Sequence, residues 1–375
     1  AMSNLAELDT PAFVVFKDRA ERNCARMQDL ARRLGLSLRP HVKTHKCAEG
    51  AALQLGDQAE RKIVVSTLAE AAFFADQGIE DILYAVALPP NKLPRVLALH
   101  ARIARFHIML DCIPALRALE EALSATPPSP GKPLSVFVKV DTGYHRAGIP
   151  PELGVELVKA VADSHVLTFA GLYSHDGHTY SCSLAKDIDG IASTDRQTIS
   201  QFADELRQTG VDVPVVSVGS TPSCSVSSSN LRGINEFHPG NYVFYDYQQF
   251  EIGSCSLEDI ACAVVARVVA HYPHRNELQV DAGALAMSKD TCKSGGFGRI
   301  MGHPDLVLYK VSQEVGIVRS LTAAPVDFSC IPIGSVLRII PNHACLAAAC
   351  FPVYHVADSA ESPAVNGVWT PCKFW

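Results

Sequence analysis

The sequence predicts a (β/α)8 TIM barrel followed by a mostly antiparallel β domain, and three observations indicate this α/β fold class. Eight apolar strands alternate with helical stretches between about residues 36 and 242, which favours a closed barrel over an open doubly wound sheet. An open nucleotide-binding sheet would carry a phosphate loop, but the chain contains neither GxGxxG nor GxxxxGK followed by Ser or Thr. From about residue 250, short β-rich runs replace the helical periodicity.

The predicted barrel elements follow one another in a regular order, each strand being a short apolar run. Strands are predicted at residues 36–43, 62–66, 81–86, 105–111, 134–140, 167–173, 213–218 and 233–237. The helices between them are predicted at residues 47–55, 68–77, 92–99, 113–123, 152–162 and 194–209.

The second domain is predicted from strands that glycine, proline and aspartate separate. These strands are expected at residues 261–269, 277–281, 306–311, 316–319, 335–340 and 353–356. An N-terminal strand at residues 10–16 is expected to join the same domain. We therefore predict a barrel at residues 18–250 and a β domain made of residues 1–17 and 251–375.

Composition excludes several classes of protein. Hydrophobic residues make up 48% of the 375 residues, enough for a large core. The net charge of −6 makes nucleic acid an unsuitable partner, and no apolar run reaches the ~18–20 residues that cross a membrane. The 12 cysteines are scattered without a CxxC pair, and the N-terminus has no signal-peptide pattern. These features predict reduced cysteines and a cytoplasmic location.

The end of the first predicted strand is rich in basic residues. It reads RPHVKTHK over residues 39–46, and a strand would place His41, Lys43 and His45 on one face. A lysine at a barrel mouth near other cations is partly desolvated, which lowers its pKa and suits Schiff-base chemistry. A solvated or phosphate-contacting strand end is the alternative interpretation.

The loops after the seventh and eighth strands predict a phosphate site. They carry Gly219, Ser220 and Thr221, and then Gly240 with Asn241. Barrel enzymes often bind phosphate there, since glycine lets backbone N–H groups approach an anion. Ordinary Gly/Pro turns are the alternative. An amine facing a phosphate nest across the mouth suggests pyridoxal 5'-phosphate on Lys43.

Two further groups of residues could complete such a site. Four residues at or after the ends of the fifth and sixth strands could contact a pyridoxal ring: Arg146, Tyr173, Tyr180 and His178. In the β domain, His343 and Cys345 are separated by one residue, so a strand would place both on one face. Imidazole plus thiolate suits an ion such as Zn²⁺, although a core histidine and a core cysteine would read the same way.

With these residues, the sequence resembles fold-type III pyridoxal-phosphate enzymes, which share the general shape of alanine racemase. Within them, the sequence is similar to the group of D-threonine aldolase, metal-activated D-serine dehydratase and D-threo-3-hydroxyaspartate dehydratase. The resemblance covers nearly the whole chain. Its motifs are RPHVKTHK at 39–46, VSTLAEA at 65–71, VGSTPSC at 218–224, HPGNYVFYD at 238–246, DAG at 281–283, QEVG at 313–316 and NHAC at 342–345.

The resemblance implies a role for each candidate residue. Lys43 would be the Schiff-base lysine, Arg146 the arginine near the ring oxygen, and Tyr173 and Tyr180 the ring-contacting tyrosines. The phosphate cup would be made of Gly219, Ser220, Thr221, Gly240 and Asn241. His343 and Cys345 would bind a divalent metal (Zn, Mn or Mg). The resemblance also implies a homodimer with the site where barrel and β domain meet, and a small D-amino acid as substrate.

The same resemblance leaves two reactions open. Cys345 matches the dehydratases, but His178 stands where they are expected to have asparagine, and Ser288-Lys289-Asp290 also departs from them. A histidine at 178 could take the β-hydroxyl proton, which a retro-aldol cleavage needs and an elimination of water does not. We therefore expect a D-threonine aldolase that forms glycine and acetaldehyde. D-serine dehydratase and D-threo-3-hydroxyaspartate dehydratase are the alternatives.

Two rival classes fit less well. A non-catalytic pyridoxal-phosphate carrier would be a single barrel without the β domain that residues 250–375 predict. An amino-acid racemase would need a second catalytic base and would not need the His343 and Cys345 pair.

Overall fold

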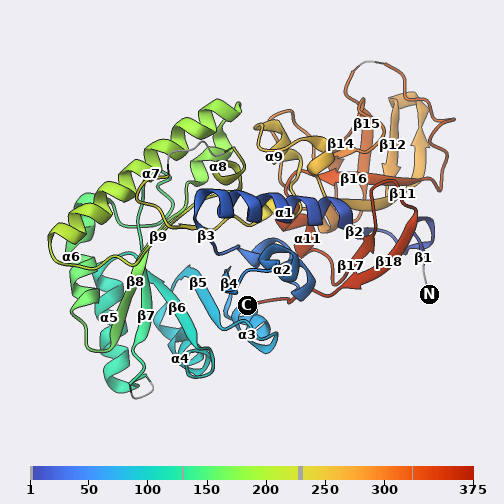
Figure 1. The fold of residues 1–375 in the computed structure, drawn as a ribbon. Coiled ribbons are helices and arrows are strands. Elements are labelled where there is room, and N and C mark those ends of the chain that lie inside the picture. The colour runs from blue at the N-terminus through green and yellow to red at the C-terminus, as the bar shows by residue number, and fades with distance from the viewer. Residues whose placement is uncertain (1–2, 129–130, 227–230, 323) are drawn as a thin grey trace. The chain divides into compact units, whose positions relative to one another are not determined.

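In the computed structural model, the described residues, 3–128, 131–226, 231–322 and 324–375, form two compact units (Figure 1). The barrel unit comprises Arg26–Lys43, Gln54–Gly240 and Cys372–Trp375. The β unit comprises Ala1–Ala25, Thr44–Leu53 and Asn241–Pro371. The predicted domain limits at residues 17/18 and 250/251 stay a proposal beside this division by compactness.

The barrel unit contains one sheet of eight parallel strands. They are β3 Ser37–Leu38, β4 Lys62–Val65, β5 Asp81–Ala87, β6 Arg105–Leu110, β7 Leu134–Lys139, β8 Leu167–Ser174, β9 Val215–Val218 and β10 Glu236–Phe237. Their order is β3-β10-β9-β8-β7-β6-β5-β4, and every pair is parallel. A parallel bridge between His41 and Val64 joins the two ends of the sheet. The predicted (β/α)8 barrel is therefore confirmed.

The helices of the barrel lie outside its strands, as Figure 1 shows for α4 to α7. The helices between residues 17 and 225 are α1 Lys17–Leu34, α2 Ala48–Leu55, α3 Leu68–Asp76, α4 Leu93–Arg102, α5 Ile113–Ala125, α6 Pro151–Ala162, α7 Ala185–Gln208 and α8 Thr221–Ser225. The first half of α1 and most of α2 belong to the β unit. Local sequence explains several starts: Thr67 caps α3 by accepting the Glu70 N–H, and proline stands in the first turn of α5 and α6. Helix α7 begins at Ala185, ahead of the predicted residue 194.

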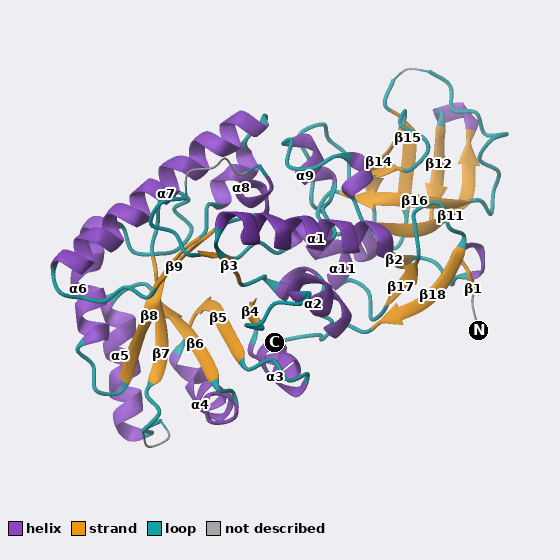
Figure 2. Cartoon of the chain, viewed as in Figure 1, coloured by secondary structure: helices purple, strands orange, loops and turns teal. Residues whose placement is uncertain are grey.

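The β unit contains one sheet of ten strands. Figure 2 draws the strands as orange arrows. They are β1 Ser3–Asn4, β2 Ala12–Phe16, β11 Cys262–Tyr272, β12 Glu277–Val280, β13 Gly298–Ile300, β14 Leu306–Val311, β15 Gly316–Ser320, β16 Val336–Pro341, β17 Tyr354–Ala357 and β18 Ala364–Trp369. Their order is β1-β18-β17-β2-β11-β12-β15-β14-β13-β16, and β11 also pairs with β16, so the last six strands close into a barrel. All pairings are antiparallel except β2 with β17.

Short helices connect these strands. The α-helices of the β unit are α9 Tyr247–Glu251, α10 Ala284–Met287 and α11 Ala344–Ala349. The 3-10 turns of the chain are η1 Leu5–Glu7, η2 Val42–Thr44, η3 Pro90–Lys92, η4 Gly177–Ser181, η5 Asn241–Val243, η6 Leu257–Asp259 and η7 Pro273–Arg275. Strands β13 and β18 were not predicted; β13 is only three residues long and begins with glycine, which weakens a strand pattern.

The first barrel strand is shorter than predicted. β3 ends at Leu38, and after Pro40 the chain turns into η2, which contains Lys43. Pro40 has no N–H to donate, so beyond it the chain keeps only separate bonds to its neighbours, from the His41 N–H and to the Pro40 carbonyl, and no regular strand continues. The prediction that His41, Lys43 and His45 share one face of a strand is therefore wrong.

A network of charged side chains is buried in the barrel unit. Arg39 pairs with Asp81 and donates from Nε to Glu236 Oε1 at 3.0 Å. Lys62 Nζ lies 3.2 Å from Glu236 Oε2, and His107 Nε2 lies 3.2 Å from Asp81 Oδ1. Despite the cost of burial, the charges and hydrogen bonds of His107 and Arg39 hold the pKa of Asp81 well below its usual range. Arg39 is the buried cation that both carboxylates share, in addition to the separate partners of each.

We expect Arg39→Met to destabilise the protein by about 3–5 kcal/mol, because it leaves two buried carboxylates without their shared cation. The measurement is urea unfolding at neutral pH. Arg105→Met is the matched control, since Arg105 pairs with the same Asp81 at 2.9 Å but its side chain is 59% exposed. The control should cost less than about 1 kcal/mol. Equal losses from the two variants would contradict this account.

Candidate functional site

Lys43 lies in a cationic part of the barrel unit. It is half-buried in η2, and its backbone N–H donates to His41 Nδ1 at 3.4 Å. Lys139 ends strand β7, and its pKa is lowered to about 8, first by burial, then by the charge of Arg146 and to a smaller degree by that of Lys43, against Asp111. Three basic side chains from three elements thus share one environment, which favours an anionic ligand.

Aromatic rings from β8 and from the segment after β10 stack beside this cationic group. Tyr173 is almost fully buried and stacks on His238 with ring centroids 3.8 Å apart and an interplanar angle of 14°. His238 donates to or accepts from Ser217 Oγ through Nδ1 at 2.8 Å. Tyr180 lies 6.5 Å from His175, centroid to centroid. Tyr173 therefore borders His238 and Tyr180 borders His175, and the ring centroids of the two histidines are 6.3 Å apart.

His175 is a residue that the sequence analysis did not assign. Its Nδ1 lies 2.9 Å from the Gly219 carbonyl, which can only accept, so this nitrogen carries the proton. Burial and then the charge of Lys43 lower the pKa of His175 to about 3. The ring is therefore neutral, with Nε2 able to accept. Its place two residues after Tyr173 at the end of β8 is the signal that could have identified it.

The loop after β9 has features that fit a phosphate cup. Gly219 has a φ of +140°, and a Cβ there would lie 2.8 Å from Cys224 Sγ. Ser220 caps α8 reciprocally with Ser223, so its hydroxyl is engaged. Thr221 Oγ1 is buried and has no hydrogen-bond partner among the described residues. That unpaired hydroxyl, next to a backbone that excludes any side chain, fits an anion such as the phosphate of pyridoxal phosphate.

The other two predicted cup residues behave differently from each other. A Cβ on Gly240 would lie 2.6 Å from the His41 carbonyl oxygen, so only glycine allows this close approach of two backbones. The Asn241 side chain donates from Nδ2 to Asp246 Oδ2 at 2.7 Å and lies 3.6 Å from Cys345 Sγ. Asn241 is thus placed with the predicted metal pair in the β unit.

Arg146 and His178 both lie against Tyr144. The Arg146 guanidinium is 4.8 Å from the Tyr144 ring centroid, and His178 stacks on the same ring at 6.2 Å. His178 Nε2 lies 3.6 Å from Asp195 Oδ1. Burial lowers the pKa of His178, and burial followed by the charge of Asp176 raises that of Asp195 to about 8. The predicted base therefore faces Asp195 and Tyr144, and the two groups meet largely uncharged.

Asp195→Asn should make stability less dependent on pH. Since the folded pKa of Asp195, about 8, lies above the unfolded value of about 3.9, wild type loses stability as pH rises from 4 to 8. The amide cannot titrate, so the melting temperature of the variant relative to wild type should rise by a few degrees between pH 5 and pH 8. Asp204→Asn, at an exposed position of the same helix, is the control. A difference that stays constant with pH would contradict the raised pKa.

His343 and Cys345 meet at a strand-to-helix turn of the β unit. β16 ends at Pro341, His343 is the N-cap of α11, and Cys345 lies in the first turn of that helix. The prediction that a strand places the pair on one face is therefore wrong. The turn nevertheless brings them together, because the Cys345 side chain hydrogen-bonds the His343 ring.

The pair is held by neighbours within the same unit. Cys345 Sγ is 3.1 Å from Thr44 Oγ1, and His343 Nδ1 is 2.9 Å from Asp290 Oδ2. Asp246, which is buried, accepts the Ala344 N–H at 2.9 Å as well as the Asn241 amide. Thiolate and imidazole are preferred zinc ligands, so the donor set fits a divalent ion. Across the described ranges, no group of three or more His, Cys, Asp or Glu side chains is arranged to hold one.

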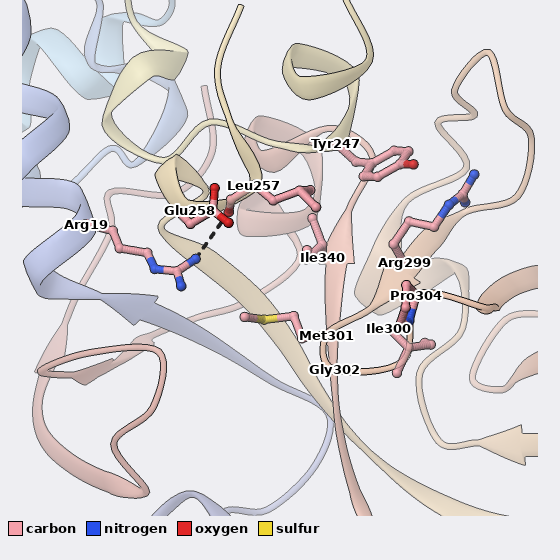
Figure 3. A pocket seen from close by; sticks show the side chains of 10 residues that line it. All are labelled: Arg19, Tyr247, Leu257, Glu258, Arg299, Ile300, Met301, Gly302, Pro304 and Ile340. Atoms are coloured by element: carbon pink, nitrogen blue, oxygen red, sulfur yellow. Dashed lines mark hydrogen bonds between the residues drawn. The ribbon is translucent and has the colours of Figure 1, made fainter. Parts of the chain in front are cut away.

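A separate cavity of about 240 Å³ lies in the β unit (Figure 3). Leu257, Met301 and Ile340 line it with Tyr247 and two arginines. Arg19 donates to the Leu257 carbonyl at 3.2 Å, and Arg299 lies 4.5 Å from the Tyr247 ring centroid, so both cations are engaged. The cavity contains none of the predicted site residues.

Comparison with known proteins identifies the family. Residues 15–248 match the family model described as alanine racemase, N-terminal domain, and residues 261–357 match that of a putative serine dehydratase domain. The chain is 40% identical to the D-serine dehydratase of Dictyostelium discoideum, over 99% of this chain and 98% of that protein. It is 38% identical to the D-threo-3-hydroxyaspartate dehydratase of Delftia sp. strain HT23, over 93% and 94% of the two chains.

Comparison with solved structures identifies the same relatives. The D-threo-3-hydroxyaspartate dehydratase from Delftia sp. HT23 superposes with a TM-score of 0.92 and 35% identity over 100% of both chains. In the comparison of sequences, a D-threonine aldolase of Arthrobacter is less similar, at 29% identity over 90% of this chain and 86% of that protein.

The chain belongs to the alanine-racemase-like family of fold-type III pyridoxal-phosphate enzymes, and it is a lyase of the branch that carries the serine dehydratase domain. Pyridoxal 5'-phosphate and a divalent metal fit as its cofactors. In the described part of the chain, no helix has both the length and the hydropathy that crossing a bilayer requires.

Proposed function

We propose that this protein is a dehydratase of D-configured β-hydroxy-α-amino acids, with D-serine or D-threo-3-hydroxyaspartate as substrate. The observation that carries the proposal is similarity along the whole chain to dehydratases of those two compounds, at 40% and 38% identity. The aldolase expected from the sequence has weaker support, at 29% identity. The dehydratase alternative therefore replaces the aldolase as the preferred function.

The residues of the barrel unit have complementary roles in this proposal. Pyridoxal phosphate, when bound, supplies the electron sink for bond breaking at Cα. Lys43 supplies the amine that holds its aldehyde and then accepts or returns the Cα proton. Arg146 would donate to the cofactor ring oxygen. Thr221 and the N–H groups around Gly219 would hold the phosphate, and the neutral His175 ring would lie against the pyridoxal ring with Tyr180.

The pair in the β unit would hold the metal. A divalent ion, when bound, acts as a Lewis acid on the β-hydroxyl that leaves as water. Solved structures of the D-threo-3-hydroxyaspartate dehydratase include a histidine-to-alanine variant and a cysteine-to-alanine variant, the second in a metal-free form. The two substituted positions are two residues apart in that protein, as His343 and Cys345 are here.

His178 has a smaller part in this proposal than in the aldolase expectation. A base for the β-hydroxyl proton would need a basic ring nitrogen directed at substrate. His178 instead directs Nε2 toward the Asp195 carboxyl, and its Nδ1 is buried without a partner among the described residues. Elimination of water requires no such base.

We also propose a homodimer in the cytoplasm, which light scattering and fractionation would test.

Product analysis separates the candidate reactions. With D-serine the enzyme should form pyruvate and ammonia, and with D-threo-3-hydroxyaspartate it should form oxaloacetate and ammonia. D-Threonine should yield 2-oxobutanoate and ammonia; glycine and acetaldehyde from it would establish the aldolase and refute the dehydratase. EDTA should lower the rate at least about tenfold, and added Zn²⁺ or Mn²⁺ should restore it. The L-enantiomers serve as controls and should not react.

Borohydride reduction should fix the cofactor covalently to Lys43. Peptide mapping by mass spectrometry would locate the adduct, and Lys43→Ala should abolish both the adduct and activity. Lys46→Gln, three residues along the chain, is the control and should retain both. An adduct on Lys139, the other amine of the cationic group, would contradict the assignment.

A further inference from the structure

Asp290 makes a direct contact with the predicted metal ligand His343. Its Oδ2 lies 2.9 Å from His343 Nδ1, and the two side chains are 33% and 32% exposed. The contact joins the loop that follows α10 to the turn between β16 and α11, both within the β unit.

The loop that carries Asp290 is anchored beside His343. Asn342, the residue before His343, donates from Nδ2 to the Asp290 carbonyl at 2.9 Å and to the Gly296 carbonyl at 2.8 Å. Farther along, Glu251 accepts the Lys293 and Ser294 N–H groups at 2.8 and 2.9 Å. Asp290 therefore stands in a fixed position relative to the ring that it contacts.

The chemistry of this contact determines which ring nitrogen can bind an ion. A carboxylate only accepts, so Nδ1 of His343 donates to Asp290 and Nε2 is the ring nitrogen left to bind an ion. A carboxylate on the far nitrogen of a metal-binding histidine also orients the ring and raises its basicity. We infer that Asp290 is a positioning residue that fixes His343 for metal binding through Nε2; this rests on the metal pair of the proposed function.

Geometry argues against Asp290 as a metal ligand itself. An ion shared by His343, Cys345 and Asp290 would need three donors around one point, and the described residues contain no such group. The Asp290 carboxylate is also already engaged with Nδ1 of the imidazole. Asp290 thus acts through His343.

Metal binding without substrate tests the inference. Zn²⁺ affinity of the purified, cofactor-loaded enzyme is measured by competition with a chromogenic chelator, for wild type, Asp290→Ala and Asp290→Asn. Asp290→Ala should bind about 10–100-fold more weakly. Asp290→Asn should fall between the two, because the amide oxygen can still accept the Nδ1 proton. Lys289→Ala, an exposed neighbour on the same loop, is the matched control and should bind like wild type.

Co²⁺ substitution distinguishes positioning from ligation. At saturating Co²⁺, Asp290→Ala should retain the wild-type absorption bands, and its cofactor absorption and circular dichroism should also be unchanged. Altered Co²⁺ bands would mean that Asp290 is a ligand, and a Zn²⁺ affinity within twofold of wild type would mean that it does not position His343. Either result overturns the inference. If wild type binds no metal, or His343→Ala binds as well as wild type, the metal pair itself is refuted.

Discussion

Closure of the barrel through residues 39–41 is the constraint on which the site depends. The Arg39 and His41 N–H groups donate to the Phe237 and Pro239 carbonyls at 2.8 and 2.9 Å, and the Val64 N–H donates to the Pro40 carbonyl at 2.9 Å. The segment is thereby bonded on both sides, and Arg39 is further held by buried carboxylates. Because Lys43 follows two residues later, the closure that completes the fold also positions its amine.

Electrostatics organise the barrel unit around that amine. Basic side chains of Lys43, Lys139 and Arg146 gather where an anionic cofactor would neutralise them, and their charges help keep His175 neutral. The carboxyl groups of Asp176 and Asp195 are buried in the same unit. Their pKa values are raised because burial disfavours their charge. The cationic group meets the largely uncharged pair of His178 and Asp195 at Tyr144, because Arg146 and His178 both lie against that ring.

The metal pair is organised by carboxylates in a different way. Asp246 holds the start of α11 by accepting the Ala344 N–H, and Asp290 holds the His343 ring through Nδ1. With His343 and Cys345 as its two protein ligands, a bound ion would keep open positions for the atom on which it acts. Because two side chains alone fix little of an ion's geometry, the residues around His343 and Cys345 must hold them in place. This is the physical reason to expect strong effects on metal affinity from residues that never touch the ion.

The sequence by itself determined the repeating strand–helix order, the β domain and the residue types that cofactor and metal chemistry require, because periodicity and donor chemistry are local properties. Tertiary structure decided how Lys43, His343 and Cys345 are presented, since proline ends the first strand early and α11 begins where a strand was expected. It also decided the contacts of Asn241, His175, His178 and Asp290. Those contacts join residues far apart in the chain, as Asn241 and Cys345 are, or depend on turns that no periodicity encodes.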